Sequence, residues 1–190
     1  MAYARSKKIG IDAIPVIDIG AIFEGEAAEK EVGIRLLNTV QEFGFFYVEN
    51  HSIEQSLIDD VFEQARLFFY AGLEQKNKLR IKDYHRGFLP IGEAKMSGAQ
   101  NRDYKESFVW GWDVDVGDPD VPNSNWILAP NRWPSFQPKM KTVFTTYLST
   151  VNMLGIYLLR ALALALGVSR EHFVQNFFKP LTRASIIYYP

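Results

Sequence analysis

The sequence contains no cysteine and only three histidines among its 190 residues. Without cysteine there can be no disulfide, no thiolate catalysis and no zinc site built on thiolates, which fits a reducing compartment such as the cytoplasm. The histidines, His51, His85 and His172, lie far apart and form none of the spacings His-x-His, His-x-Asp or His-Glu-x-x-His. They therefore do not predict a metal site.

An excess of charge of one sign is also missing. The 21 Lys and Arg residues nearly balance the 22 Asp and Glu residues, for a net charge of -1. We therefore expect no nucleic-acid or anionic-membrane partner, and a small molecule or a protein is the expected partner instead. The longest apolar stretch, residues 151–168, contains Asn152 and Arg160 and continues a helical pattern. It predicts a buried core helix rather than a membrane span.

Motifs of several enzyme classes are absent as well. There is no Gly-x-Gly-x-x-Gly or phosphate-loop motif, and no Gly-x-Ser-x-Gly motif, which leaves nucleotide binding and serine hydrolysis without support. The acidic run at residues 113–120 lacks the glutamate that would complete a calcium loop, so it predicts a solvated acidic loop. The chemistry of these residues, taken alone, does not identify an enzyme.

The hydrophobic patterning that is present predicts one compact unit of helices and strands. Gly44 stands where a left-handed helix cap would sit, and Ser52 with Gln55 predicts a capping box for the next helix. We expect strands at 14–19, 45–50, 106–112 and 183–190, and helices at 29–43, 53–68, 74–79, 138–167 and 169–178.

The order and the amino-acid sequences of several segments resemble those of a known family. The segments are IPVIDI, FGFFYVENHSI, RGFLPIGEAK, DYKESFVWG, PNRWP, ALALALGV and IIYYP. In this order they resemble the N-terminal half of the isopenicillin N synthase-like family of non-haem iron oxygenases, most of which use 2-oxoglutarate.

This resemblance implies an α+β fold. Residues 1–190 would be a single unit, with a helical scaffold over about 1–180 and the first strands of a double-stranded β-helix, or jelly roll, over 181–190. The rest of that barrel needs on the order of 80–100 further residues. In the family those residues carry a His-x-Asp and a later His that hold Fe(II), and an Arg-x-Ser that holds the co-substrate. We therefore expect the iron site to lie outside residues 1–190.

The resemblance also implies site residues. Tyr189 matches a family tyrosine that meets a carboxylate near the iron, and Arg183 shares its face by the strand period of two. Arg86, Phe88 and Phe108 match positions that border the substrate cavity, where an arginine could bind a carboxylate with both nitrogens. The alternatives are that Arg86 is a surface residue, that both phenylalanines belong to the core, and that Tyr189 only packs.

The expected function is that of an oxidoreductase, a 2-oxoglutarate- and Fe(II)-dependent dioxygenase that uses O2 on a small-molecule C–H bond. Many members of the family have Arg at the position of Ser185, and several have Asn at the position of Ile187. These differences leave open whether 2-oxoglutarate is used. The isolated chain is predicted to be inactive, and its oligomeric state is open. The alternative is a non-catalytic binding module or split-enzyme half that pairs its terminal strand with a partner chain.

Overall fold

The structure, a computed structural model, describes residues 14–82, 84–94, 100–121 and 127–190, and it has an α+β fold. These residues form two compact units. The first unit comprises the described residues up to Ser52 together with Met153–Phe177, and the second comprises Ile53–Asn152 and Phe178–Pro190. Because each unit has its own hydrophobic core, they are described separately, and the expectation of a single domain stays a prediction.

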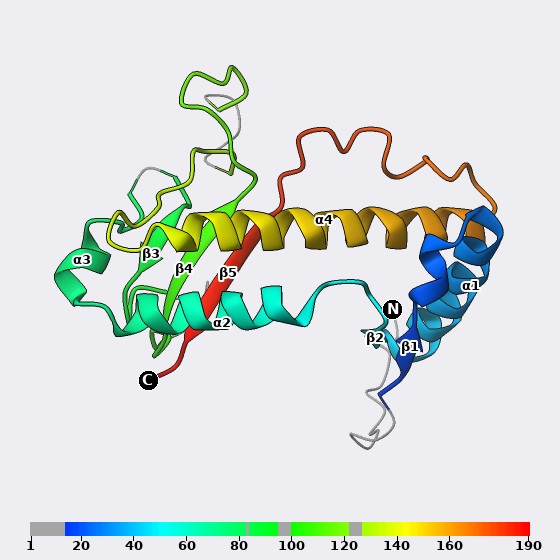
Figure 1. Ribbon diagram of the computed structural model, residues 1–190, viewed down its shortest axis with the longest axis horizontal. Helices are drawn as coiled ribbons and strands as arrows, with labels where there is room; N and C mark the ends of the chain where they lie inside the picture. The colour runs from blue at the N-terminus through cyan, green and yellow to red at the C-terminus, as the bar shows by residue number, and fades with distance from the viewer. Residues whose placement is uncertain (1–13, 83, 95–99, 122–126) are drawn as a thin grey trace. The chain divides into compact units, whose positions relative to one another are not determined.

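The first unit is a strand–helix–strand arrangement. Strand β1 (Val16–Asp18) pairs in parallel with β2 (Tyr47–Glu49), and the short helix η2 (Gly20–Phe23) and helix α1 (Glu26–Phe43) connect them (Figure 1). Parallel strands require such a crossover, which here is helical. The core consists of Ile17, Ile19, Ile22, Val32, Leu36 and Ala161. The strands predicted at 14–19 and 45–50 are thus confirmed, each in a shorter form.

The ends of two helices test the capping predictions. Gly44 caps α1 in the left-handed conformation, with φ of 83°, and its N–H donates to the carbonyl of Val40, as predicted. The prediction of a capping box formed by Ser52 and Gln55 is wrong. Glu54 is the N-cap of α2 (Gln55–Tyr70), and Gln55 donates to Asp59 instead. Ser52 has a φ of 59° and precedes the cap by two residues, so the helix begins later than the pattern suggested.

The second unit is a three-stranded sheet covered by helices. Strands β3 (Gly87–Leu89), β4 (Glu106–Gly111) and β5 (Arg183–Tyr188) form an antiparallel sheet in that order (Figure 1). The predicted terminal strand therefore pairs with β4, which was also predicted. Strand β3 was missed, because it is only three residues long, begins with a glycine and is followed directly by Pro90.

The core of the second unit lies on one face of this sheet. Residues of α2, of the sheet and of the first half of α4 (Lys139–Ala165) form one cluster. Its fully buried aromatic members are Phe68, Phe88, Phe108, Trp110 and Phe144. The helix predicted at 53–68 is confirmed as α2, and Val61 and Phe68 are buried on its inner side.

A buried ion pair ties the sheet to the short helix α3 (Leu73–Asn77). The Lys76 ammonium lies 2.9 and 3.0 Å from the carboxylate oxygens of Glu106 on β4, and it donates to the Phe69 carbonyl at 2.8 Å. Both side chains are only 7% exposed. Since a buried charge without a partner is strongly unfavourable, this pair fixes β4 against α3.

Two predictions near the C-terminus are wrong. Residues 169–178 form successive turns rather than a helix. The second half of α4, from Met153, was expected to be covered on most sides, yet among its residues only Ala161 and Ala163 are buried. Within the first unit it packs along one stripe on the core, which leaves its other sides half-exposed. By length and composition α4 is also a helix that could cross a membrane, a property that core helices share.

Candidate functional site

Strand β5 presents two chemically different faces. Its inner face, Ala184, Ile186 and Tyr188, packs against the core of the second unit. Its outer face, Arg183, Ser185 and Ile187, is exposed. This alternation is the one that the period of two predicts for a strand covered on one side. The outer face is therefore the surface from which Arg183 can reach a ligand.

Arg86 is the most unusual polar residue near this sheet. It directly precedes β3 and is 1% exposed. Its Nη1 donates to the carbonyl of His85 at 3.1 Å, whereas its Nε has no hydrogen-bond partner among the described residues. Among the described residues no ion pair includes Arg86, and the carboxylate that acts on it, Asp113, lies 4.0 Å from Lys141. A buried guanidinium with an unused donor is suited to receive an anion.

Gly111 at the end of β4 makes room for this guanidinium. A Cβ atom at residue 111 would lie 2.5 Å from Nη2 of Arg86 and 2.8 Å from the carbonyl oxygen of Thr182. Gly111 is also the register partner of Arg183 on β5. Because opposite residues in an antiparallel pair share a face, Arg86 and Arg183 meet around this glycine.

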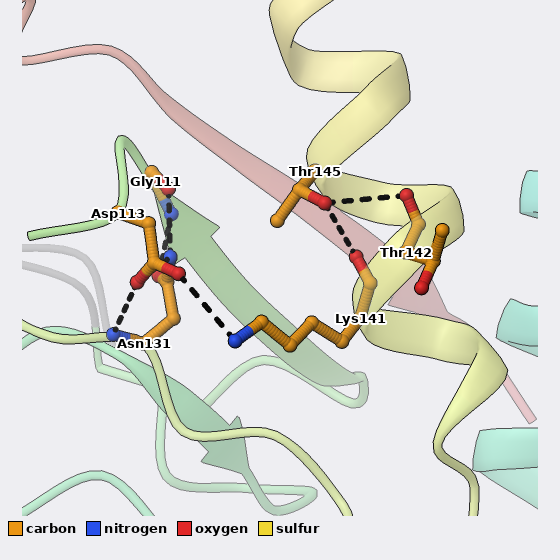
Figure 2. A network of polar contacts seen from close by, with 6 residues as sticks. All are labelled: Gly111, Asp113, Asn131, Lys141, Thr142 and Thr145. Atoms are coloured by element: carbon orange, nitrogen blue, oxygen red, sulfur yellow. Dashed lines mark hydrogen bonds and ion pairs between the residues drawn. The ribbon is translucent and has the colours of Figure 1, made fainter.

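The end of β4 is held in place by a polar network (Figure 2). The Asn131 side chain accepts from the N–H of Gly111 and donates to its carbonyl, both at 2.9 Å. The same amide donates to Asp113 at 3.0 Å, and Lys141 of α4 lies 4.0 Å from that carboxylate. Asn131 thus serves β4 as a neighbouring strand would, and it fixes the position of Gly111.

His85 completes the cluster from the loop before β3. Its Nδ1 lies 3.1 Å from Nη1 of Arg183. A guanidinium can only donate, so Nδ1 must accept and the imidazole must be neutral in this arrangement. His85, Arg86 and Arg183, which come from two distant parts of the sequence, are thereby placed together.

Burial and neighbouring arginines both disfavour the charged forms of Arg86 and His85. Burial, followed by the charge of Arg183, lowers the pKa of Arg86 to about 10, and Asp113 opposes this shift. Burial also lowers the pKa of His85, and the charges of Arg183 and Arg86 add to the effect. Each shift reports that the charged form is unfavourable here, and a bound anion would relieve that cost.

A small hollow lies beside Arg86. Its volume is about 240 Å³, and it is lined by Tyr84, Arg86, Val116, Val121, Pro130 and Arg132. The second arginine is engaged, because Arg132 donates to the carbonyls of Arg80 and Lys78 at 2.7 and 3.0 Å. The hollow is therefore lined by apolar residues and by two arginines, Arg86 and Arg132.

The other predicted site residues lie elsewhere. Phe88 and Phe108 are fully buried in the core beneath the sheet, which gives both a packing role, and their contact with a substrate stays a prediction. Tyr189 follows β5 and is 67% exposed. Its expected contact with the co-substrate also stays a prediction.

A larger apolar hollow of about 450 Å³ lies between α2 and β5. Its lining includes Phe62, Phe69, Tyr70, Trp110, Ile186 and Tyr188. Phe62 and Tyr70 are 71% and 67% exposed. This surface is apolar and lies beside the edge strand of the sheet.

The described residues do not provide an iron site. They contain no group of three or more His, Cys, Asp or Glu side chains that could hold a metal ion. In the acidic run, Asp118 and Asp120 instead pair with Lys179 at 3.0 and 2.7 Å. The described residues therefore do not fit Fe(II), and the expectation that the iron site lies outside residues 1–190 stays a prediction.

Sequence reasoning missed His85, Gly111 and Asn131. A glycine inside the strand motif ESFVWGW was a usable signal, because such glycines often mark a close approach of another group. His85 and Asn131 carried no such signal, since their partners lie 98 and 20 residues away.

Comparison with known proteins agrees with this architecture. Residues 14–136 match the family described as non-haem dioxygenase in morphine synthesis, N-terminal. A probable iron/ascorbate oxidoreductase of Dictyostelium discoideum is 28% identical over 98% of this chain and 55% of its own length. A homoarginine-6-hydroxylase of Arabidopsis thaliana is 30% identical over 93% of this chain and 52% of its own length.

Solved structures show the same fold. A 2OG-Fe(II) oxygenase family protein from Caulobacter crescentus superposes with a TM-score of 0.80 at 23% identity, over 94% of this chain and 56% of that one. A full-length protein of Neurospora crassa, solved in complex with α-ketoglutarate, superposes with a TM-score of 0.74 at 24% identity. The match covers 96% of this chain and 56% of that one. The chain thus spans about half the length of the proteins that it matches.

Proposed function

Because the chain belongs to the isopenicillin N synthase-like family of non-haem dioxygenases, we propose that it is the N-terminal part of a longer oxygenase. That oxygenase depends on Fe(II) and 2-oxoglutarate and uses O2 to oxidise a C–H bond of a small molecule. The observation that carries this proposal is the family match over residues 14–136. Relatives about twice as long, including one structure bound to α-ketoglutarate, support it.

In this proposal Fe(II) and most of the 2-oxoglutarate site lie beyond residue 190. Strand β5 begins the jelly-roll barrel, and its outer face, continued by Tyr189, faces the barrel interior. Since the described residues have no donor set for the metal, the contribution of this chain is to bind and orient the substrate. We further propose that the protein is cytoplasmic and acts without nucleic acid or a membrane.

Within this chain, Arg86 and Arg183 are the proposed substrate-binding groups. Arg86 is held in one position by burial and by its contact with Gly111, so little conformational freedom is lost when it binds a ligand. Arg183 lies on the exposed face of β5, where it can approach the same ligand. Two guanidinium groups give a directed binding site for a carboxylate of the substrate.

The first test is the coding sequence beyond residue 190 and the intact mass of the natural protein. A continuation with a His-x-Asp, a later His and an Arg-x-Ser is expected. The purified longer protein should then convert 2-oxoglutarate to succinate only when Fe(II) is supplied. A chain that ends at Pro190, or a longer protein without Fe(II)-dependent succinate formation, would contradict the proposal.

One observation favours a second candidate, a binding module or split-enzyme half. Strand β5 is the last strand of its sheet, so within the described residues one of its edges has no strand partner. The apolar hollow of about 450 Å³ lies beside this strand. Such an edge readily accepts a strand from another chain. A 21.8 kDa protein that co-purifies with a complementary polypeptide would support this candidate over the first.

A further inference from the structure

We infer that Asn131 is the positioning residue of the Arg86 site: its side-chain amide ends the pairing of β3 with β4 and thereby sets the Arg86 guanidinium where it binds a carboxylate of the substrate. This inference deepens the proposed function and rests on it, because it takes Arg86 as a substrate-binding group. It assigns a role to Asn131 that acts through Arg86 and requires no contact with the ligand.

Asn131 takes the place of a strand partner at the end of β4. Strands β3 and β4 pair Gly87 with Val109, and the same register continued by two residues would bring His85 opposite Gly111. The N–H and the carbonyl of Gly111 are instead both bonded to the Asn131 side chain at 2.9 Å (Figure 2). Strand β3 therefore ends at Gly87, because the backbone groups that would extend the ladder are already engaged.

The chain turns away from β4 just before β3 begins. The N–H of Arg86 donates to the carbonyl of Tyr84 at 2.7 Å, and a bond between residues two apart closes a tight turn around His85. The Arg86 side chain then lies against Gly111, where a Cβ atom would be 2.5 Å from Nη2 and 2.8 Å from Cζ. The position of the guanidinium therefore depends on the position of Gly111.

The same amide also places the carboxylate that acts on Arg86. Nδ2 of Asn131 donates to Oδ1 of Asp113 at 3.0 Å (Figure 2), and the negative charge of Asp113 favours the charged form of Arg86. Lys141 of α4 lies 4.0 Å from Oδ2 of the same carboxylate. One side chain thereby holds both the glycine against which Arg86 lies and the carboxylate whose charge supports it.

Such a support contributes to binding by fixing the arginine in advance. The Arg86 side chain is 1% exposed, and its Nε has no partner among the described residues. A guanidinium binds a carboxylate through paired N–H donors, and a displacement of about 1 Å is enough to lose that geometry. Loss of the Asn131 amide should therefore weaken carboxylate binding although no group that touches the ligand is removed.

The experiment compares Asn131→Asp with the parent 190-residue chain. In this variant one oxygen of residue 131 still accepts from the N–H of Gly111. The other oxygen replaces a donor that lies 2.9 Å from the Gly111 carbonyl and 3.0 Å from Asp113. Two carboxylates at this distance repel each other at about pH 8, whereas at about pH 5 they share a proton and a hydrogen bond forms between them again.

The readout is the Nε–H group of Arg86 in proton–nitrogen NMR spectra, identified by its loss in Arg86→Lys. Benzoate is the carboxylate probe, and benzamide is its uncharged control. At about pH 8 we expect Asn131→Asp to shift the Nε–H signal and to bind benzoate about tenfold more weakly than the parent, and at about pH 5 we expect parent behaviour. Each comparison is made at one pH, so the titration of His85 affects both proteins alike.

Two further variants serve as controls. Asn50→Asp is the matched control, because the Asn50 side chain donates to Asp18 in the first unit, so this change also places a second carboxylate beside an existing one. It should leave the Arg86 signal and the benzoate affinity unchanged at both pH values. Asn131→Ala removes the amide without adding charge, and it should bind benzoate about tenfold more weakly at both pH values.

The inference is overturned if Asn131→Asp matches the parent at about pH 8, if it differs equally at both pH values, or if Asn50→Asp has the same effect. It is also overturned if benzoate leaves the Arg86 signal of the parent unchanged. Circular dichroism shows whether each variant is folded, and if Asn131→Asp unfolds at high pH, Asn131→Ala with parent affinity would refute the inference instead.

The titration uses neither iron nor 2-oxoglutarate, so it fails independently of the proposed function. A negative result together with Fe(II)-dependent succinate formation by the longer protein would refute the role of Asn131 alone. A positive result without that reaction would refute the proposed function and leave the positioning of Arg86 by Asn131 in place.

Discussion

The buried pair of Lys76 and Glu106 provides the sharpest stability prediction. Lys76→Met removes the ammonium while it keeps most of the apolar volume. Glu106 then loses its two contacts of 2.9 and 3.0 Å, and the Phe69 carbonyl loses its donor. The Phe88 ring, whose centroid lies 5.2 Å from the Lys76 ammonium, loses a cation contact as well. The variant therefore leaves an uncompensated carboxylate in a site that is almost closed to water.

The expected loss follows from this burial. Breaking a buried pair by removal of one partner typically costs about 3–5 kcal/mol in the free energy of unfolding. Replacing both charges, as in Lys76→Met with Glu106→Leu, leaves no unpaired charge and should bring the protein to within about 1–2 kcal/mol of the parent. The double variant is thus expected to be more stable than the single one.

The assay is urea unfolding followed by circular dichroism for the parent, both single variants and the double variant. Lys139→Met is the matched control, because Lys139 pairs with Asp60 on the surface with side chains 61% and 43% exposed. That change should cost less than about 1 kcal/mol. If Lys76→Met is as mild as Lys139→Met, or if the losses of the two single variants simply add, the pair does not hold β4 in the way argued above.

Three further predictions concern other contacts. Gly111→Ala should destabilise the protein by about 1–3 kcal/mol in urea unfolding, because its Cβ would lie 2.5 Å from Arg86, and an unchanged midpoint would contradict the close packing. Glu29→Gln should cost about 2 kcal/mol, since Glu29 is 1% exposed and accepts from Arg170 at 2.5 Å, whereas equal stability would show that this ion pair contributes nothing. Folding lowers the pKa of His85, so the unfolded chain binds a proton more readily than the folded chain. The contribution of His85 to the free energy of unfolding should therefore be fully present above about pH 6.5 and decrease as the pH falls below that value. His85→Asn should lose this part of the pH dependence, and a stability profile identical to that of the parent would contradict the prediction.

Most helices and strands, and the family, could be predicted from the sequence. Local patterns set these features, because the apolar stripe of α2 and the left-handed cap at Gly44 depend on residues a few positions apart. The ordered segments from IPVIDI to IIYYP carried the resemblance, and the match over residues 14–136 confirms it.

The composition of the candidate site depends instead on contacts between distant segments. His85 and Arg183 are 98 residues apart, and their contact exists because β5 pairs with β4 in one register. The burial of Arg86 depends on a glycine of another strand, which in turn is fixed by Asn131 from a distant loop. Such contacts leave no periodic signal in the sequence, because they arise where segments distant along the chain meet after folding. Local sequence patterns therefore predict the helices and strands, whereas the positions of Arg86 and Arg183 follow from the pairing of strands that are distant in the sequence.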